Sequence, residues 1–144
     1  MGARIIKNNQ EYKQTDADYE IYSDFDTMFR VNPFNGQLAR KTNESSVAQS
    51  LRNLLLTNKY ERRRNPNFGS WIRNYLFENF NIHTAGEVED QVRAAIRSHE
   101  PRAKIISLEV TATEDENELV IDLRFATVSS PTPERLRVSL YRVR

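Results

Sequence analysis

The sequence predicts an α+β fold in which three amphipathic helices pack on an antiparallel β-meander, with a short N-terminal hairpin before them. Two observations lead to this class. Apolar residues recur with the period of a helix over the middle of the chain, and with a period of two over its last third. The length of 144 residues suits one domain. We expect a mobile polar arm at residues 1–17, followed by a single domain at residues 18–144.

The first predicted element is the hairpin. An extended segment over residues 19–25 leads to two short apolar stretches at residues 28–31 and 37–40. Between them, residues 32–36 have the sequence Asn-Pro-Phe-Asn-Gly, in which both proline and Asn-Gly are typical of turns. We therefore expect two short antiparallel strands that meet at this turn.

The first two predicted helices lie in the middle of the chain. One runs over residues 44–57, with Thr42 or Asn43 as its cap, because small polar side chains accept bonds from the first amides of a helix. The other runs over residues 69–79. Each has apolar residues at the spacing of a single helical face. These residues are Val47, Leu51, Leu54 and Leu55 in the first helix, and Ile72, Tyr75, Leu76 and Phe80 in the second.

The third predicted helix has a start signal and a stop signal. Thr84 and Glu87 have the spacing of a capping box, in which two side chains bond the amides of the first turn. The helix must end before Pro101, because the residue that precedes a proline avoids the helical conformation. Its apolar face consists of Val88, Val92, Ala95 and Ile96.

Three strands are predicted in the last third of the chain. Apolar and polar residues alternate there, which is typical of strands with one buried face. Turn-forming residues at 115–117 and 131–133 separate the strands. We expect an antiparallel meander whose inward face is covered by the helices. The inward residues are Ile106, Leu108, Val110 and Ala112, then Leu119, Ile121, Leu123 and Phe125, then Leu136, Val138 and Leu140.

The composition excludes several classes of protein. The chain has no cysteine, which rules out disulfides, iron–sulfur clusters and thiolate zinc sites. It has no apolar run of the length that a membrane span or a signal peptide needs, so we expect cytosolic synthesis and no membrane partner. The net charge of +1 gives little long-range attraction to nucleic acid, which is not expected as a partner.

The sequence contains no motif for catalysis, a cofactor or a metal. His83 and His99 do not have the spacing of a metal motif, and glycine-rich phosphate loops are absent. The acidic residues occupy no motif either, although a glycosidase needs two suitably separated carboxylates. Cations and aromatics mix over residues 59–75, so a nucleic-acid-binding module stays open. The alternative is a loop whose arginines pair with acids and whose aromatics join the core.

Two segments point to a binding role. Residues 57–70 form a long charged connection between two predicted helices, and long ordered loops tend to be functional. In Glu100-Pro101-Arg102, the proline ends a helix and two opposite charges flank it. The guanidinium of Arg102 suits a bidentate pair with a carboxylate. A local ion pair at the end of the helix is the alternative interpretation of this corner.

Taken together, these segments resemble one family. The stretches 54–57 (Leu-Leu-Leu-Thr), 60–62 (Tyr-Glu-Arg) and 65–70 (Asn-Pro-Asn-Phe-Gly-Ser), followed by Glu-Pro-Arg before a strand, resemble the baseplate wedge and sheath-initiator family of contractile phage tails. This family has relatives in type VI secretion baseplates. The resemblance covers residues 20–126. Many members have glycine where Tyr60 stands, so the backbone of the loop can differ there.

The resemblance implies a non-catalytic structural component of the virion tail baseplate, assembled in the host cytoplasm. Its partners would be baseplate wedge proteins and the tail sheath protein, with the tail tube as a further candidate. It implies that Glu100, Pro101 and Arg102 bind the inner wedge core. The loop residues that it assigns to contacts are Glu61, Arg62, Pro66, Phe68 and Gly69.

The last predicted strand, over residues 135–144, bears on the sheath. The resemblance implies a template for the first sheath ring, and a regular strand at a sheet edge could accept a partner strand. An interior strand, already paired on both sides, is the alternative. Some relatives carry a lysozyme-like label, so a peptidoglycan-degrading enzyme is the alternative function. The residues assigned to sheath pairing are Arg135, Arg137, Ser139, Tyr141 and Val143.

Overall fold

The structure is a computed structural model that describes residues 21–78, 82–113, 118–128 and 130–142. The predicted arm at residues 1–17 lies outside the described residues. The strands form two antiparallel sheets, one of β1 and β2 and one in the order β3-β4-β5, so the predicted α+β class with antiparallel strands is confirmed. The elements are β1 (Ser23–Phe25), β2 (Arg40–Thr42), α1 (Asn43–Leu56), α2 (Ile72–Tyr75), α3 (Ile82–His99), β3 (Ala103–Thr113), β4 (Glu118–Thr127) and β5 (Glu134–Tyr141).

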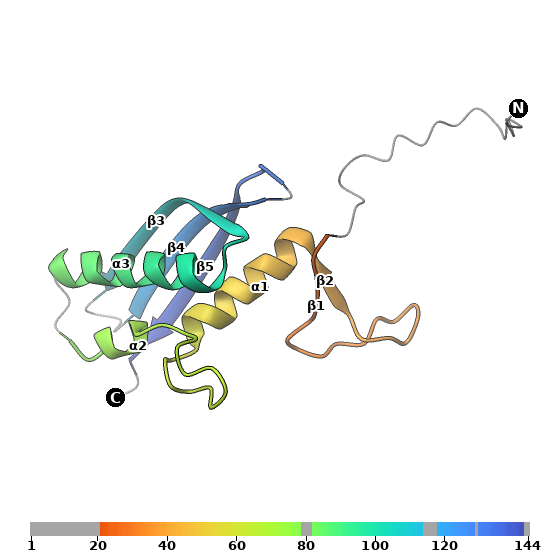
Figure 1. Ribbon diagram of the computed structural model, residues 1–144, viewed down its shortest axis with the longest axis horizontal. Helices are drawn as coiled ribbons and strands as arrows, with labels where there is room; N and C mark the ends of the chain where they lie inside the picture. Colours follow the sequence, from red (N-terminus) through yellow and green to blue (C-terminus); the bar gives the residue numbers. More distant parts are fainter. Residues whose placement is uncertain (1–20, 79–81, 114–117, 129, 143–144) are drawn as a thin grey trace, which may run out of the picture.

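The hydrophobic core lies between the three-stranded sheet and the two long helices. In Figure 1, α3 lies across one face of this sheet with α1 beside it, while the β1–β2 hairpin projects from the start of α1. All eight residues predicted for the apolar faces of α1 and α3 are buried. The inward residues of the central strand have no exposed surface: Leu119, Ile121, Leu123 and Phe125. The shared core therefore fixes the end of α3 and the start of β3 relative to α1.

The second predicted helix is wrong in length, because α2 has only four residues. No side chain caps its start at Trp71. After its end, three consecutive amides bond the carbonyls three residues before them, and such tight turns do not propagate as an α-helix. Ile72 and Leu76 are buried as expected. Phe80 lies outside the described residues.

The capping box predicted at Thr84 is wrong, because α3 already begins at Ile82 and Thr84 lies inside it. The helix ends at His99, before the proline, as predicted. For α1, the cap is Thr42, one of the two predicted residues, but no side-chain bond is made there. Asn43 is instead the first helical residue, and its side-chain oxygen ties α1 to the chain entering β1.

The predicted hairpin is present, but its strands lie farther from the turn. Of the residues in the three pairs between β1 and β2, only Arg40 belongs to the predicted stretches 28–31 and 37–40. Those two stretches are joined in the described structure by the bridge between Val31 and Leu38. The turn itself is as predicted. The amide of Gly36 donates to the carbonyl of Asn32 at 2.9 Å, and Gly36 has a φ of +68° that glycine adopts readily.

Ile106 points away from the core, which contradicts its predicted inward position. The pairing register of β3 with β4 shifts between Ile105 and Ser107. An extra residue in one strand reverses the alternation of side chains beyond it. Ile106 is therefore 53% exposed, whereas Leu108 is buried as predicted.

Candidate functional site

The Glu-Pro-Arg corner, defined as Glu100, Pro101 and Arg102, joins α3 to β3. The amide of Glu100 makes the last helical bond, to the carbonyl of Ile96 at 2.8 Å. The amide of Ala103 then donates to the carbonyl of Glu100 at 3.1 Å. Pro101 has no amide proton, so the helical bonding cannot continue through it. The chain consequently passes from helix to strand within three residues.

Glu100 accepts a network of hydrogen bonds while its side chain is only 4% exposed. Nε of Arg102 donates to Oε1 of Glu100 at 2.5 Å, and Nη2 of Arg102 donates to Oε2 at 2.7 Å. The hydroxyl of Ser50, on α1, donates to Oε2 at 2.5 Å. A buried charge is stable only when it is paired and hydrogen-bonded in this way. The bidentate pair suggested for Arg102 is therefore made within the corner itself.

The pKa of Glu100 lies below its usual range. Burial alone would raise this pKa, because the charged form is poorly solvated in the interior. The hydrogen bonds from Arg102 and Ser50 and the positive charge of Arg102 outweigh the effect of burial. Glu100 is thus ionised at neutral pH, and its carboxylate fixes the guanidinium of Arg102.

Arg102 and Pro101 are the parts of the corner that reach the surface. The Arg102 side chain is 35% exposed, and Pro101 is exposed as well. The guanidinium lies 5.0 Å from the ring centre of Tyr22, which allows a cation–π contact. Glu100 and Tyr22 therefore hold Arg102 in place, while part of its side chain stays open to solvent.

The loop of residues 57–70 closes on itself at its neck. The amide of Ser70 donates to the carbonyl of Thr57 at 2.9 Å, and the Ser70 hydroxyl donates to the carbonyl of Leu55 at 2.9 Å. Gly69 has a φ of +115°, and a Cβ at this position would lie 2.5 Å from the Thr57 oxygen. Only glycine fits such a position without a shift of the backbone.

Tyr60 occupies the position at which the resemblance leads us to expect glycine. Its φ is +68°, in the left-handed region that glycine favours. Its amide donates to the carbonyl of Pro66 at 2.8 Å, and its ring centre lies 5.7 Å from that of Trp71. Beside it, the Glu61 carboxylate accepts a bond from the amide of Asn58 at 2.9 Å. The loop thus keeps a glycine-like conformation with tyrosine in place.

A stack of side chains brings the loop and the corner together. The guanidinium of Arg62 lies 4.0 Å from the ring centre of Phe68. The ring of Phe68 lies 5.4 Å from that of His99, which directly precedes Glu100. Phe68 is half-buried against the core. Two of the predicted loop residues, Arg62 and Phe68, therefore lie next to the end of α3, from which the corner begins.

The residues predicted for sheath pairing lie elsewhere, on β5. The corner leads into β3, whereas β5 is at the opposite edge of the sheet and pairs with β4. The described strand ends at Tyr141, and Val143 lies outside the described residues. Arg135 pairs with Asp122 on β4 through its guanidinium, which holds the pKa of Asp122 below its usual range. The outward side chains of β5 therefore face the side of the sheet opposite the core.

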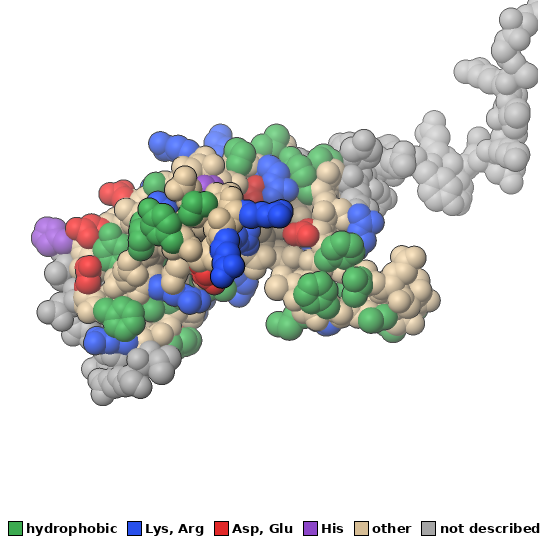
Figure 2. All heavy atoms as spheres, turned by 60° about the horizontal axis from the view of Figure 1, so that its bottom comes forward, with side chains coloured by type: hydrophobic (Ala, Val, Ile, Leu, Met, Phe, Trp, Pro, Cys, Tyr) green, Lys and Arg blue, Asp and Glu red, His purple; other side chains and the backbone are tan. Residues whose placement is uncertain are grey.

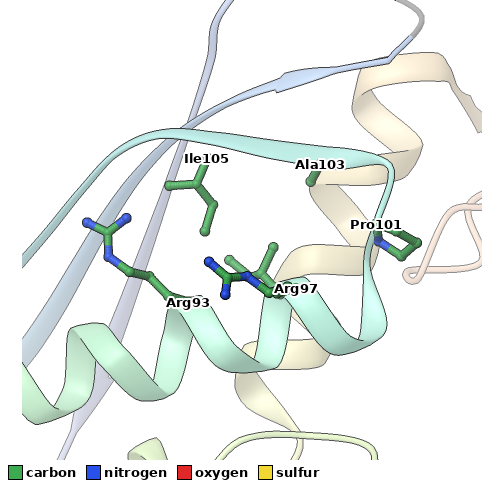
Figure 3. Close-up of a pocket in the computed structure, with 6 residues that line it drawn as sticks. Arg93, Arg97, Pro101, Ala103 and Ile105 are labelled. Atoms are coloured by element: carbon green, nitrogen blue, oxygen red, sulfur yellow. The ribbon is translucent and has the colours of Figure 1, made fainter.

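A groove of about 400 Å³ lies between α3 and the start of β3. In Figure 3, Arg93 and Arg97 extend from α3, and Ala103 and Ile105 from β3, with Pro101 at one end. Of the described residues that line it, none carries a carboxylate. The groove therefore offers two cations over an apolar floor and lacks a pair of acids for general acid–base chemistry.

The described residues also contain no cluster of three or more histidine or acidic side chains that could hold a metal ion. Among the helices described here, none is both long enough and apolar enough to cross a membrane.

Sequence reasoning missed two residues that position the corner. Ser50 is half-buried on α1, three residues after the buried Val47 and four before the buried Leu54, and a polar residue so close to the core usually has a hydrogen-bond partner. That signal could have indicated the bond to Glu100, although not which partner it would find. No sequence pattern connects Tyr22 with Arg102, because their contact depends on how the hairpin meets the body.

Comparison with known proteins bears on this arrangement. A family described as baseplate wedge protein gp25 matches residues 41–132. Baseplate wedge protein gp25 of Enterobacteria phage T4 is 30% identical over 122 residues, which are 84% of this chain and 92% of the relative. A Geobacter sulfurreducens protein, provisionally described as a tail lysozyme, has a TM-score of 0.66 at 30% identity, covering 72% of this chain and 95% of that one.

The same fold recurs in larger assemblies. A chain of the anti-feeding prophage baseplate has a TM-score of 0.59 at 20% identity, covering 83% of this chain and 84% of that one. A chain of the type VI secretion baseplate complex has a TM-score of 0.57 at 16% identity, and the match covers 67% of this chain and 90% of that one. The fold and these matches define a structural protein of contractile baseplates. The chain belongs to the baseplate wedge protein gp25 family, and its place is the tail baseplate.

Proposed function

We propose that this chain is a non-catalytic baseplate component that binds the inner wedge core through the Glu-Pro-Arg corner and the adjoining loop. We further propose that it offers the outer edge of β5 to the tail sheath protein. Contact with the tail tube belongs to the same proposal. The observation that carries it is the preorganised corner: Arg102 is already held by Glu100, Ser50 holds the same carboxylate, and Pro101 is exposed beside it.

The corner supports a binding role because its charged group is fixed before a partner arrives. Less side-chain freedom is then lost on binding, which favours affinity. Glu100 is buried, so we assign it to positioning and assign the direct contact to Pro101 and Arg102. The stack of Arg62, Phe68 and His99 extends the same surface into the loop.

The wedge contact can be tested with Arg102→Ala and Arg52→Ala, two substitutions of exposed or half-exposed arginines. Arg52→Ala is the control, since it removes the same charge from α1. Truncating one member of a charged pair at an interface typically costs about 2–5 kcal/mol of binding free energy. We expect purified Arg102→Ala to keep its fold by circular dichroism and to bind wedge proteins at least about 30-fold more weakly. Parent-like binding by Arg102→Ala would remove the corner from the interface.

The proposal for the sheath rests on the position of β5. In the described residues its backbone pairs on one side only, with β4, so alternate amides point to a free edge. Hydrogen exchange can test this: amides of β5 that exchange rapidly in the free chain should become protected in particles that carry sheath. Amides of β4 are the control, because they are paired in both states. Unchanged exchange in β5 would exclude strand pairing.

The non-catalytic assignment has support from the two acids that are buried in the described part of the chain. Asp26 pairs with Arg30, and Glu100 pairs with Arg102, and these partners lower both pKa values. A general acid needs a raised pKa to hold its proton at neutral pH. The enzymatic alternative predicts release of soluble fragments from purified peptidoglycan. Release that stops when one carboxylate is replaced would establish that alternative.

A further inference from the structure

The N-terminal hairpin, residues 21–42, exposes a group of large apolar side chains. Figure 2 shows hydrophobic side chains gathered on the part of the molecule that projects from the body. Phe34 is 97% exposed and Phe29 is 68% exposed. Contiguous apolar surface of this kind marks an interaction site more often than a plain surface. We name as the hairpin patch the residues Ile21, Phe25, Met28, Phe29, Val31, Phe34 and Leu38.

Polar contacts fix the base of the hairpin together with Tyr22, which packs against the core. Asp26 is buried, and its carboxylate pairs with Arg30 at 2.6 Å and with Lys41 at 3.7 Å. The side-chain amide of Gln49, on α1, donates to the backbone carbonyl of Phe25 at 2.7 Å. Its side-chain oxygen accepts a hydrogen bond from the backbone amide of Thr27 at 3.2 Å. The buried contacts of Asp26 and Gln49 are therefore polar, and the residues of the hairpin patch are left on the outside.

Phe29 adopts a backbone conformation that a bulky residue disfavours. Its φ is +50°, in the left-handed region. Its amide donates to the carbonyl of Asp26 at 2.8 Å, so the turn that buries Asp26 also directs Phe29 outward. Strained residues persist where the surroundings hold them, and they cluster at functional sites. The exposed Phe29 therefore lowers the stability of the free chain through its backbone strain.

We propose that the hairpin patch inserts into an apolar groove on another protein of the baseplate. The hairpin projects from the body (Figure 1), so a concave surface is its natural complement. A phenylalanine buries roughly 150–250 Å². Because Phe25, Phe29 and Phe34 are 57%, 68% and 97% exposed, together they supply roughly half of the area that each partner contributes to a standard interface, about 800 Å².

Membership in a baseplate family supports the choice of another baseplate protein as the partner. The family model matches residues 41–132, and the 122 residues aligned with the T4 relative also reach into the hairpin. The contact goes beyond the corner and β5, because none of the patch residues belongs to either. Since the chain is a baseplate component, the proteins available to cover the patch are its neighbours in that particle.

Phe29→Asn tests the proposal, with Phe77→Asn as the matched control. Phe77 is 69% exposed on the body, so the two substitutions remove similar exposed surface. Asparagine tolerates the left-handed region, so Phe29→Asn should keep or raise the melting temperature of the free chain. We expect it to lower the copies of this chain per purified particle at least about tenfold, as measured by quantitative mass spectrometry. Parent-like copy numbers for Phe29→Asn, or an equal loss for Phe77→Asn, would overturn the proposal.

A photo-crosslinker attached at the position of Phe34 identifies what covers the patch in assembled particles. We expect a covalent link to a different baseplate protein. A link between two copies of this chain would overturn the proposal, as would binding to phosphatidylglycerol vesicles that Phe29→Asn abolishes. The variant Arg102→Ala separates this inference from the proposed function. If Arg102→Ala loses wedge binding but the crosslink from position 34 is still formed, the contact of the corner and the contact of the hairpin patch are independent.

Discussion

The hydroxyl of Ser50 donates a hydrogen bond of 2.5 Å to the carboxylate of Glu100, fifty positions later in the chain. This bond joins the middle of α1 to the Glu-Pro-Arg corner. The same carboxylate holds the guanidinium of Arg102. The orientation of a proposed contact residue therefore depends on a helix that does not itself contain it.

Ser50→Ala should lower the free energy of unfolding by about 1–3 kcal/mol, because a buried carboxylate loses one of its donors. Ser45→Ala is a control in the same helix, since the exposed Ser45 hydroxyl bonds only the carbonyl of Thr42 among the described contacts. We expect a change within about 0.5 kcal/mol for this control. Urea denaturation measures both. Equal losses of unfolding free energy in the two variants would mean that the bond from Ser50 to Glu100 contributes no more to stability than the exposed bond of Ser45.

The ionised Glu100 should make stability depend on acid. Its folded pKa lies below the ordinary value of 4.5, so its contribution is fully present above about pH 4.5 and is lost as pH falls through the folded pKa. We expect the parent to be more stable than Glu100→Gln at pH 7. The difference should shrink as the pH is lowered below 4.5, as followed by urea denaturation across that range. A difference that grows in acid would reverse the assigned sign.

Gly69→Ala should be far more damaging than Gly36→Ala. Both glycines have positive φ values, but a Cβ at residue 69 would lie 2.5 Å from the Thr57 oxygen, whereas none of the described atoms lies within 4 Å of one at residue 36. We expect a loss of more than about 2 kcal/mol for Gly69→Ala and about 1–2 kcal/mol for Gly36→Ala. Thermal and urea denaturation measure both. Similar losses would show that the neck of the loop can relax.

The bulge in β3 can be tested with one residue on each side of the sheet. Leu108→Ala removes a buried side chain and should cost about 2–5 kcal/mol. Ile106→Ala removes an exposed one, and we expect less than about 1 kcal/mol. The comparison uses urea denaturation of the two purified variants. A larger loss for Ile106→Ala would put that side chain in the core and remove the bulge.

The sequence predicted those parts of the fold that burial of apolar side chains decides. The faces of α1 and α3 and the inward residues of β4 could be read from spacing, because each must lie on the side of its element that meets the core. Ile106 was misplaced because a bulge leaves no mark in the alternation of residue types. Thr84 and Glu87 had capping-box spacing, but other residues began the helix earlier.

The candidate site was predictable only in its sequence-local part. Pro101 predicts the end of a helix. Glu100 and Arg102 flank it in the sequence, so their charges lie near one another in any fold. The partners of those charges are set by the packing of distant segments: Ser50 comes from α1 and Tyr22 from the chain entering the hairpin. Such contacts depend on tertiary geometry, which periodicity does not encode. The exposure of Phe29 and Phe34 likewise could not be read from their residue types.

The bulge at Ile106 also makes the two margins of the three-stranded sheet unequal. On β3 the extra residue breaks the even repeat of donors and acceptors, so an incoming strand would fall out of step part of the way along. On β5 the eight pairs with β4 run without a shift. The proposed addition of a sheath strand is therefore better suited to the regular edge at β5 than to the interrupted edge at β3.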